Sequence, residues 1–189
     1  NHTVDYMTAV LTAFRANEEK VAAAVAECRR MGIEVLPPDV HESHLEFTVE
    51  GDAIRFGLLA VKNVGQGAIE SIIAAREAEG PFKSLGDLCR RIDLRLSNRK
   101  VLESLAKVGA LNAFGHPAQV LEGLDDAIAA GAATQRDLAT GQTSLFDVGA
   151  AESMVLERPL PNVPEAPVRE RLRWEKELLG LYLSDHPLG

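Results

Sequence analysis

The feature that most constrains the fold is residues 58–76, where an apolar segment, a tight turn and a helical pattern follow one another. The turn contains Asn63 and Gly65. Small and apolar residues then recur at helical spacing, namely Ala68, Ile69, Ile72 and Ile73. This order predicts two short helices joined by a hairpin, the arrangement known as helix-hairpin-helix.

The chemistry of such a hairpin favours phosphate binding. Backbone N–H groups in the first turn of a helix have no partner within the helix, and the helix dipole attracts anions to them. A glycine-containing turn lets a phosphate approach closely, and such contacts ignore base identity. The candidate residues are Lys62, Asn63, Val64, Gly65, Gln66 and Gly67. A plain helix–helix turn is the alternative.

Asn63 stands where the familiar form of this hairpin has glycine. Asparagine tolerates the left-handed backbone conformation better than most residues. We therefore expect the hairpin geometry to survive this departure.

Basic charge is concentrated after the hairpin. Residues 83–107 hold seven basic and three acidic residues, in a chain whose net charge is −8. Residues 97–98 add a second helix start there. We expect a phosphate-binding face that includes Arg90, Arg91, Asn98, Arg99 and Lys100. Alternatively, these cations pair with neighbouring carboxylates on a solvated surface, and we expect about half of the arginines to do so.

The rest of the chain is also largely helical in pattern. Helices are expected at 3–14, 17–31, 66–79, 84–91, 98–107, 117–130 and 168–180. Alternating residues at 45–49 and 54–58 flank a Glu-Gly-Asp turn and predict a β-hairpin, the one sheet expected. Residues 33–36 are expected to be extended. A second turn, at 108–115, is interpreted as a packing turn rather than a second phosphate grip, because fewer basic residues surround it.

Residues 131–167 change in composition. They are rich in Ala, Gly and Pro and predict a partly disordered linker. Within it stands the pentapeptide Gln142, Thr143, Ser144, Leu145 and Phe146. One polar anchor and two apolar side chains suit the groove of a partner protein. The alternative is that the two apolar side chains fold back on this chain.

Several classes of protein are disfavoured. The overall acidic charge argues against a chain coated in nucleic acid. Two cysteines, Cys28 and Cys89, predict free thiols in a reducing compartment rather than a disulfide framework. No apolar run has the length of a membrane span and no signal peptide is recognisable, so a cytoplasmic location is expected. The opening Asn-His-Thr-Val suggests a piece of something longer.

No catalytic constellation is evident in the sequence. It contains no Asp-x-Asp pair to gather Mg²⁺, and Asp125 and Asp126 are adjacent, so they project in different directions. The scattered histidines complete no metal site, and Gly65-Gln66-Gly67 alone is weak support for a nucleotide cofactor. We expect no catalytic residue, metal or cofactor in this chain.

Several motifs in order resemble the alpha subunits of bacterial DNA polymerase III. They are the stretches at 27–33, 36–40, 54–65, 80–85, 98–103, 109–111 and 177–188. His41 and Asp185 depart from the family pattern, which commonly has asparagine and glycine there. The resemblance implies the end of the fingers at 1–57, a tandem helix-hairpin-helix DNA-binding domain at 58–130, a linker with a clamp-binding peptide at 131–167, and a helix leading to the next domain at 168–189.

The resemblance also implies partners and chemistry. The partners are double-stranded primer–template DNA, the sliding clamp that the pentapeptide 142–146 would dock, and other holoenzyme subunits, with no membrane. The intact protein is then a DNA-directed DNA polymerase that uses Mg²⁺, with catalytic aspartates upstream of this chain. A protein-interaction scaffold that binds no DNA is the main alternative. A free-standing helix-hairpin-helix repair enzyme is a third, disfavoured by the missing catalytic residues.

Overall fold

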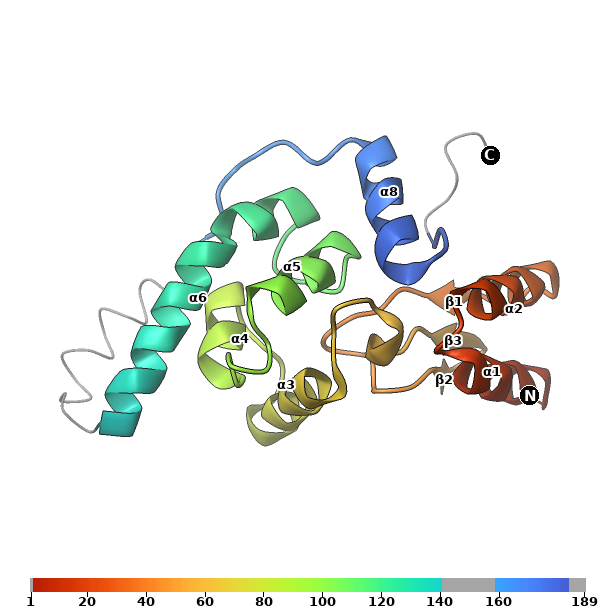
Figure 1. Cartoon of the computed structure of the whole chain (residues 1–189), viewed down its shortest axis with the longest axis horizontal. Coiled ribbons are helices and arrows are strands. Elements are labelled where there is room, and N and C mark those ends of the chain that lie inside the picture. The colour runs from red at the N-terminus through yellow and green to blue at the C-terminus, as the bar shows by residue number, and fades with distance from the viewer. Residues whose placement is uncertain (1, 141–158, 184–189) are drawn as a thin grey trace.

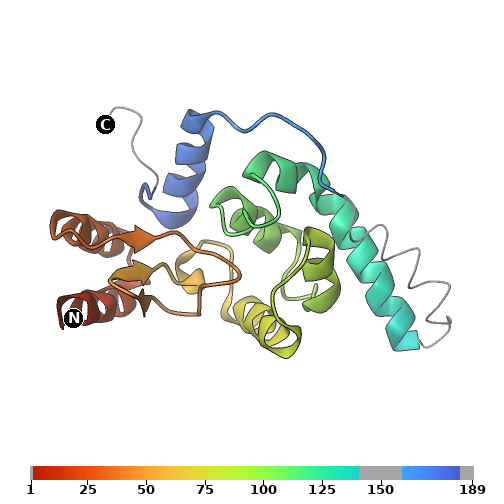
Figure 2. The same ribbon diagram turned by 180° about the vertical axis from the view of Figure 1, so that it is seen from behind.

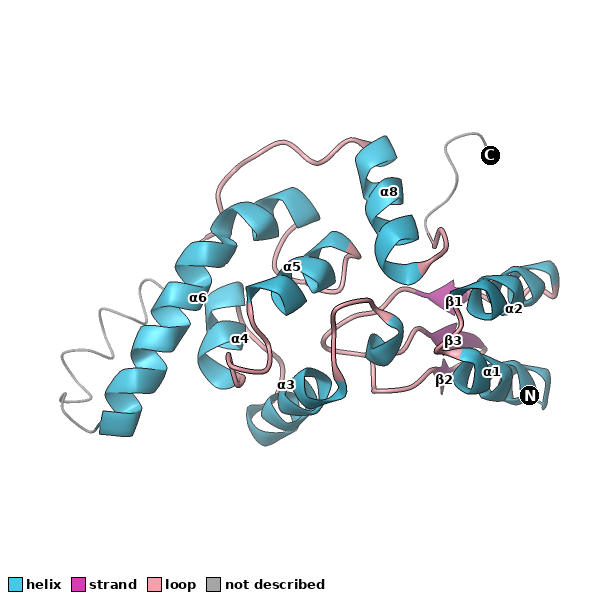
Figure 3. Cartoon of the chain, viewed as in Figure 1, coloured by secondary structure: helices cyan, strands magenta, loops and turns pink. Residues whose placement is uncertain are grey.

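The fold is mainly helical, with a small sheet near its N-terminal end (Figures 1 and 3). The computed structural model describes residues 2–140 and 159–183. The helices are α1 (His2–Phe14), α2 (Glu18–Arg30), α3 (Gln66–Glu79), α4 (Leu85–Arg91), α5 (Arg99–Lys107), α6 (Pro117–Thr140) and α8 (Val168–Leu179), with a 3₁₀ turn η1 (Leu58–Ala60). The predicted fold class is confirmed. In both views, α1 and α2 lie beside the sheet at the end opposite α6 (Figure 2).

Side-chain caps start three of the helices where the sequence predicted them. Asn17, Ser84 and Asn98 precede α2, α4 and α5, and each side-chain oxygen accepts a hydrogen bond from an N–H group in the first turn. Such caps satisfy donors that the helix itself leaves open. These boundaries therefore follow from local chemistry.

The sheet has three strands rather than the two of the predicted β-hairpin. Strands β2 (Thr48–Glu50) and β3 (Ala53–Arg55) pair antiparallel, with Val49 opposite Ile54. Strand β1 (Val35–Leu36) pairs parallel to the other edge of β3, giving the order β1-β3-β2. The prediction of one hairpin was incomplete, because β3 has a second edge whose N–H groups donate to carbonyl oxygens at 34 and 36.

Helix α6 is ten residues longer than the sequence predicted, ending at Thr140 rather than near residue 130. Alanine-rich sequence favours helix, and contacts with α4 hold the extension. A Cβ atom on Gly131 would lie 2.7 Å from the carbonyl carbon of Cys89, so the two helices approach closely there. The Gln135 amide donates to the carbonyl oxygens of Cys89, Arg90 and Ile92 at 2.9, 3.0 and 2.7 Å. The predicted linker therefore does not begin at residue 131.

Residues 159–167, here called the strap, contain no helix or strand and lead from the side of α6 to the start of α8 (Figure 1). A Cβ atom on Gly123 would lie 2.8 Å from the Leu160 side chain, so the strap lies against α6. The Gln119 amide donates to the Pro161 carbonyl at 3.2 Å, and the His116 ring lies 3.1 Å from the Val163 carbonyl. The last part of the predicted linker is thus docked on the body of the protein.

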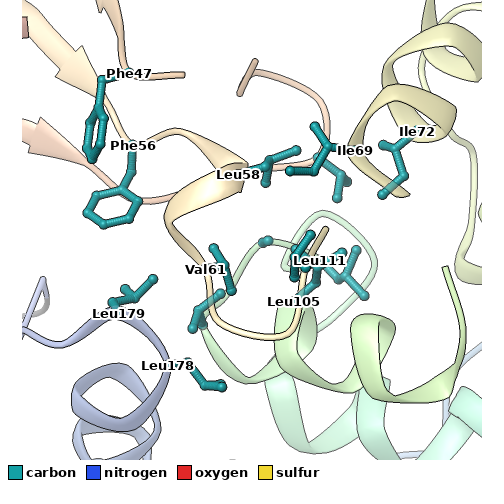
Figure 4. Close-up of a cluster of buried hydrophobic side chains, with 14 of the residues drawn as sticks. Phe47, Phe56, Leu58, Val61, Ile69, Ile72, Leu105, Leu111, Leu178 and Leu179 are labelled. Atoms are coloured by element: carbon teal, nitrogen blue, oxygen red, sulfur yellow. The ribbon is translucent and has the colours of Figure 1, made fainter. Parts of the chain in front are cut away.

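One hydrophobic core joins the sheet to the helices (Figure 4). Phe47 and Phe56 meet edge to face, with their ring centroids 4.8 Å apart. Fully buried side chains continue the core through η1, α3, α5 and the turn after α5, namely Leu58, Ile69, Ile72, Leu105 and Leu111. Leu178 and Leu179 of α8 complete it. Burial of this apolar surface is the main force that holds the sheet and the helices together.

One smaller prediction concerns the two cysteines. Cys28 and Cys89 are both free thiols, as predicted, and both are buried. Among residues 2–140 and 159–183, no helix is both long enough and apolar enough to traverse a bilayer.

Candidate nucleic-acid interface

The first hairpin, residues 61–65, connects η1 to α3. Val61 and Val64 point into the core, with 2% and 5% of their surface exposed, whereas Lys62 and Asn63 are exposed. Asn63 has a φ of 72°, in the left-handed region, and it is the one residue other than glycine with positive φ in the described part of the chain. The expectation that asparagine would accept this conformation is confirmed.

The start of α3 offers free backbone donors. Gly65 is the N-cap residue and supplies no side-chain oxygen to the first turn. The N–H groups of residues 65–68 donate to no acceptor among the described residues. Gly65 and Gln66 are exposed, so the first two of these N–H groups can be reached from outside. An open, exposed helix start of this kind attracts anions.

The start of α5 lies beside the start of α3. A Cβ atom on Gly67 would be 3.5 Å from the Leu96 side chain, and the buried Ser97 hydroxyl lies 3.5 Å from the Ala68 carbonyl oxygen. The structure therefore brings together two of the predicted groups, residues 62–67 and residues 98–100. Asn98 is used as the α5 cap, accepting from the Val101 N–H at 3.1 Å.

The cations at this surface differ in what they contact. Lys62 pairs with Glu18 of α2 at 2.7 Å, and Arg99 pairs with Asp125 of α6 at 2.6 Å and with Glu103. Lys100 is exposed and forms no ion pair with any residue of the described ranges. Exposed pairs of this kind contribute little to stability, so Lys62 and Arg99 can exchange a carboxylate for a phosphate at small cost.

Arg90 and Arg91 lie elsewhere, near the C-terminal end of α3. Both contact Glu79, in the last turn of α3, at 3.5 and 3.6 Å. That helix has 14 residues, which places its two ends about 20 Å apart. These arginines therefore do not share a site with the first hairpin.

Arg91 is a structural residue. Only 4% of its side chain is exposed, and its guanidinium donates to the carbonyl oxygens of Ala75 and Gly80 at 2.6 and 2.7 Å. It also lies 4.4 Å from the centre of the Phe82 ring. The expectation that Arg91 is available for phosphate is corrected, because its donors hold the end of α3 and the turn that follows.

Asp87 is the acidic partner of this arginine pair. Burial raises the pKa of Asp87, but hydrogen bonds from the Lys83 N–H, Arg90 and Arg91 outweigh it and hold the pKa below the ordinary 3.8. The contacts measure 3.0, 2.8 and 3.1 Å. This cluster stabilises the turn between α3 and α4.

Comparison with known proteins shows what this chain is similar to. A helix-hairpin-helix motif model matches residues 32–121, which contain both hairpins. The whole chain is 43% identical to the DNA polymerase III subunit alpha of Deinococcus radiodurans, 44% to that of Thermus aquaticus and 40% to that of Escherichia coli K12. The resemblance to bacterial DNA polymerase III alpha subunits is confirmed. The chain spans 14%, 15% and 16% of the length of these relatives.

The second hairpin, at residues 108–115, differs from the first. Its turn uses Gly109, with a φ of 85°. The helix that follows begins with Pro117, which has no N–H to offer. The His116 N–H donates to the Gln119 side chain at 3.1 Å, and the strap covers the same helix start. The interpretation of residues 108–115 as a packing turn fits this arrangement.

Sequence reasoning missed two contacts that hold the first hairpin. The Lys62 N–H donates to the carbonyl oxygen of Leu178 in α8 at 2.9 Å, and the Asn63 side chain donates to the Ser104 hydroxyl of α5 at 3.1 Å. Leu178 gave no signal, since any backbone carbonyl can accept. Ser104 gave a weak one, as a polar residue on the face of α5 that also carries Val101 and Leu105.

One predicted binding segment cannot be placed in the structure. The pentapeptide of Gln142, Thr143, Ser144, Leu145 and Phe146 lies outside the described residues. Within the described ranges, no group of three or more His, Cys, Asp or Glu side chains is arranged to hold a metal ion.

Proposed function

We propose that this chain holds duplex DNA by its phosphate backbone as part of a replicative DNA polymerase. The observation that carries the proposal is the exposed, uncapped start of α3, set beside the start of α5 with its cations. Such a surface recognises phosphates and not base edges. The residues proposed to contact DNA are Lys62, Gly65, Gln66, Gly67, Arg99 and Lys100. The prediction for Val64 is corrected, because its side chain is buried and its N–H donates to the Val61 carbonyl. The side chains of Asn63 and Asn98 are engaged by Ser104 and by the Val101 N–H.

The activity of the intact protein belongs to this proposal as well. The relatives are named as polymerase alpha subunits, so the whole protein is proposed to be a DNA-directed DNA polymerase that uses Mg²⁺. The residues of this chain hold the primer–template and leave the chemistry to segments outside it. Other holoenzyme subunits are proposed as further partners.

The test is fluorescence anisotropy of the full 189-residue chain with a labelled random-sequence duplex at several salt concentrations. A variant with Lys62, Arg99 and Lys100 changed to Ala removes the cations at the interface. The matched control changes Arg136, Arg169 and Arg173, which lie on α6 and α8, so the net charge falls equally. We expect binding to weaken with salt.

The interface variant should bind at least about tenfold more weakly, with a salt slope reduced by about one for each phosphate that is no longer neutralised. The control should bind nearly as tightly as wild type. Equal weakening in both variants would mean that only net charge matters. No binding by a folded wild-type chain at low salt would favour the scaffold alternative.

Clamp docking by residues 142–146 is a separate proposal. It is supported by the pattern of one amide and two apolar side chains. Changing Leu145 and Phe146 to Ala should abolish binding to a purified sliding clamp while leaving DNA binding intact. A control that changes Leu138, an exposed residue of α6, to Ala should leave both unchanged. Clamp binding that survives removal of both apolar side chains would overturn this proposal.

A further inference from the structure

Asn63 does more than tolerate a left-handed turn. Glycine would satisfy a φ of 72° at lower conformational cost, so the backbone alone gives no reason for asparagine here. The side-chain amide donates to the Ser104 hydroxyl at 3.1 Å, across 41 residues of sequence. Ser104 is 2% exposed and lies in α5. The bond therefore ties the tip of the first hairpin to a second helix.

A second contact joins the same two parts of the molecule. The hydroxyl of Ser97, which is fully buried, lies 3.5 Å from the carbonyl oxygen of Ala68 in the first turn of α3. Ser97 directly precedes Asn98, the N-cap of α5, whereas Ser104 lies within that helix. The hairpin and α3 are thus held at two points, one just before the start of α5 and one inside it, and two points of contact restrict sliding and rotation better than one.

The two parts that these contacts join are the two halves of the proposed interface. One half is the open start of α3 at residues 65–68, and the other is the start of α5, which carries Arg99 and Lys100. A rigid duplex presents its phosphates at fixed spacing. Donors on two separate helices can engage neighbouring phosphates together only if the distance between the helices is also fixed, because a loose pair must be ordered on binding.

We propose that Asn63 is a positioning residue for DNA binding: through Ser104 it fixes the start of α5 relative to the first hairpin, so that both engage the same duplex. The inference rests on the proposed function. Asn63 acts through its side chain, which is hydrogen-bonded to Ser104, and the residue that depends on it is Lys100, one turn earlier in α5. Energetic coupling between Asn63 and Lys100, transmitted through α5, is the signature expected of positioning.

The experiment is a double-mutant cycle on the full 189-residue chain, with DNA binding measured by anisotropy and stability by urea unfolding. Asn63→Gly keeps the backbone conformation and removes the side-chain bond, while Ser104→Ala removes the same bond from the other side. Each should weaken DNA binding about threefold to tenfold, the range for one hydrogen bond. Their combination should be no weaker than either alone.

The decisive measurement is the effect of Lys100→Ala in two backgrounds. In wild type it should weaken binding clearly, whereas in the Asn63→Gly background its effect should shrink severalfold. The unfolding free energies of the same four proteins should be additive. Asn112→Gly makes the same substitution in the second hairpin and should leave DNA binding unchanged.

The outcomes separate the two proposals. If wild type binds DNA in a salt-dependent way but Lys100→Ala has the same effect in both backgrounds, the positioning role of Asn63 is overturned and the proposed function stands. Unaltered binding by Asn63→Gly and Ser104→Ala leads to the same conclusion. If folded wild type binds no duplex, the proposed function fails and this inference fails with it.

Discussion

The two hairpins of this chain share a local design and differ in what lies over the helix that follows. Each has a residue with positive φ in its turn, Asn63 at 72° and Gly109 at 85°. After the first, α3 begins with exposed N–H groups that meet no acceptor among the described residues. After the second, α6 begins with a proline and is covered by the strap.

This difference shows that a helix-hairpin-helix pattern predicts a backbone shape but not its use. A helix start binds an anion only if its donors stay open. At the second hairpin, the start of α6 is covered because Leu160 and Pro161 pack against this helix. Both residues are distant from the turn in the sequence. At the first hairpin, α8 contacts the N–H of Lys62 and leaves the start of α3 clear.

The largest effect is expected for Arg91→Ala, which sharpens the comparison by testing what holds α3. Removing a buried, paired cation should lower the unfolding free energy by about 3–5 kcal/mol, because the carbonyl oxygens of Ala75 and Gly80 lose their donor. Urea unfolding measures this change. Arg95→Ala, with a side chain 91% exposed, should leave the midpoint nearly unchanged. Similar midpoints for the two variants would contradict a structural role for Arg91.

Gln66→Pro should make the first hairpin resemble the second. Proline is well tolerated at the first position of a helix, and Gly65 already has an extended conformation that suits a following proline. The change removes one N–H group that is proposed to bind phosphate, so DNA binding should weaken by about 1.5–3 kcal/mol. Gln66→Ala keeps the N–H and serves as the control. Anisotropy that gives the two variants equal affinity would show that the start of α3 does not hold DNA.

Gln119→Ala should loosen the cover over the second hairpin. The side chain accepts from the His116 N–H and donates to the Pro161 carbonyl, and each bond contributes about 0.5–1.5 kcal/mol. Thermal unfolding should show this modest decrease in stability, with unchanged DNA affinity. A gain in DNA affinity would break the comparison, because it would reveal the second hairpin as a covered DNA-binding element.

The smallest effect concerns acid stability of the turn after α3. The folded-state pKa of Asp87 lies below its ordinary value, so the carboxylate stabilises the fold above that value, and this contribution is lost as the pH falls through the folded pKa. Urea unfolding across acidic pH should show a shallower decline of stability for Asp87→Asn than for wild type. Identical slopes would mean that Asp87 contributes nothing on titration.

Many local features of the fold were predictable from neighbouring residues. Asn17, Ser84 and Asn98 start helices because their side chains reach the first turn. The left-handed conformation of Asn63 follows from the tolerance of asparagine for it. Such features involve residues a few positions apart, so the chain itself contains the information.

Other features depended on partners distant in sequence. Residues 131–140 have the composition of a linker, yet they are helical because Gln135 meets three carbonyl groups at the end of α4. Likewise, a run of basic residues does not reveal that Arg91 is buried while Lys100 is exposed. The type of a residue can be read from the sequence, but its burial depends on which segments pack around it.

Local chemistry along the chain was therefore enough to predict most helix starts and the first helix-hairpin-helix turn, while the order of motifs carried the resemblance to polymerase alpha subunits. Tertiary packing alone decided which helix start is open, which cation is available, and that Asn63 meets Ser104. The physical reason is that a buried donor or charge must find a partner inside the protein, whereas an exposed one keeps its water and stays available to a ligand. Which groups are buried depends on segments that come together only when the chain has folded.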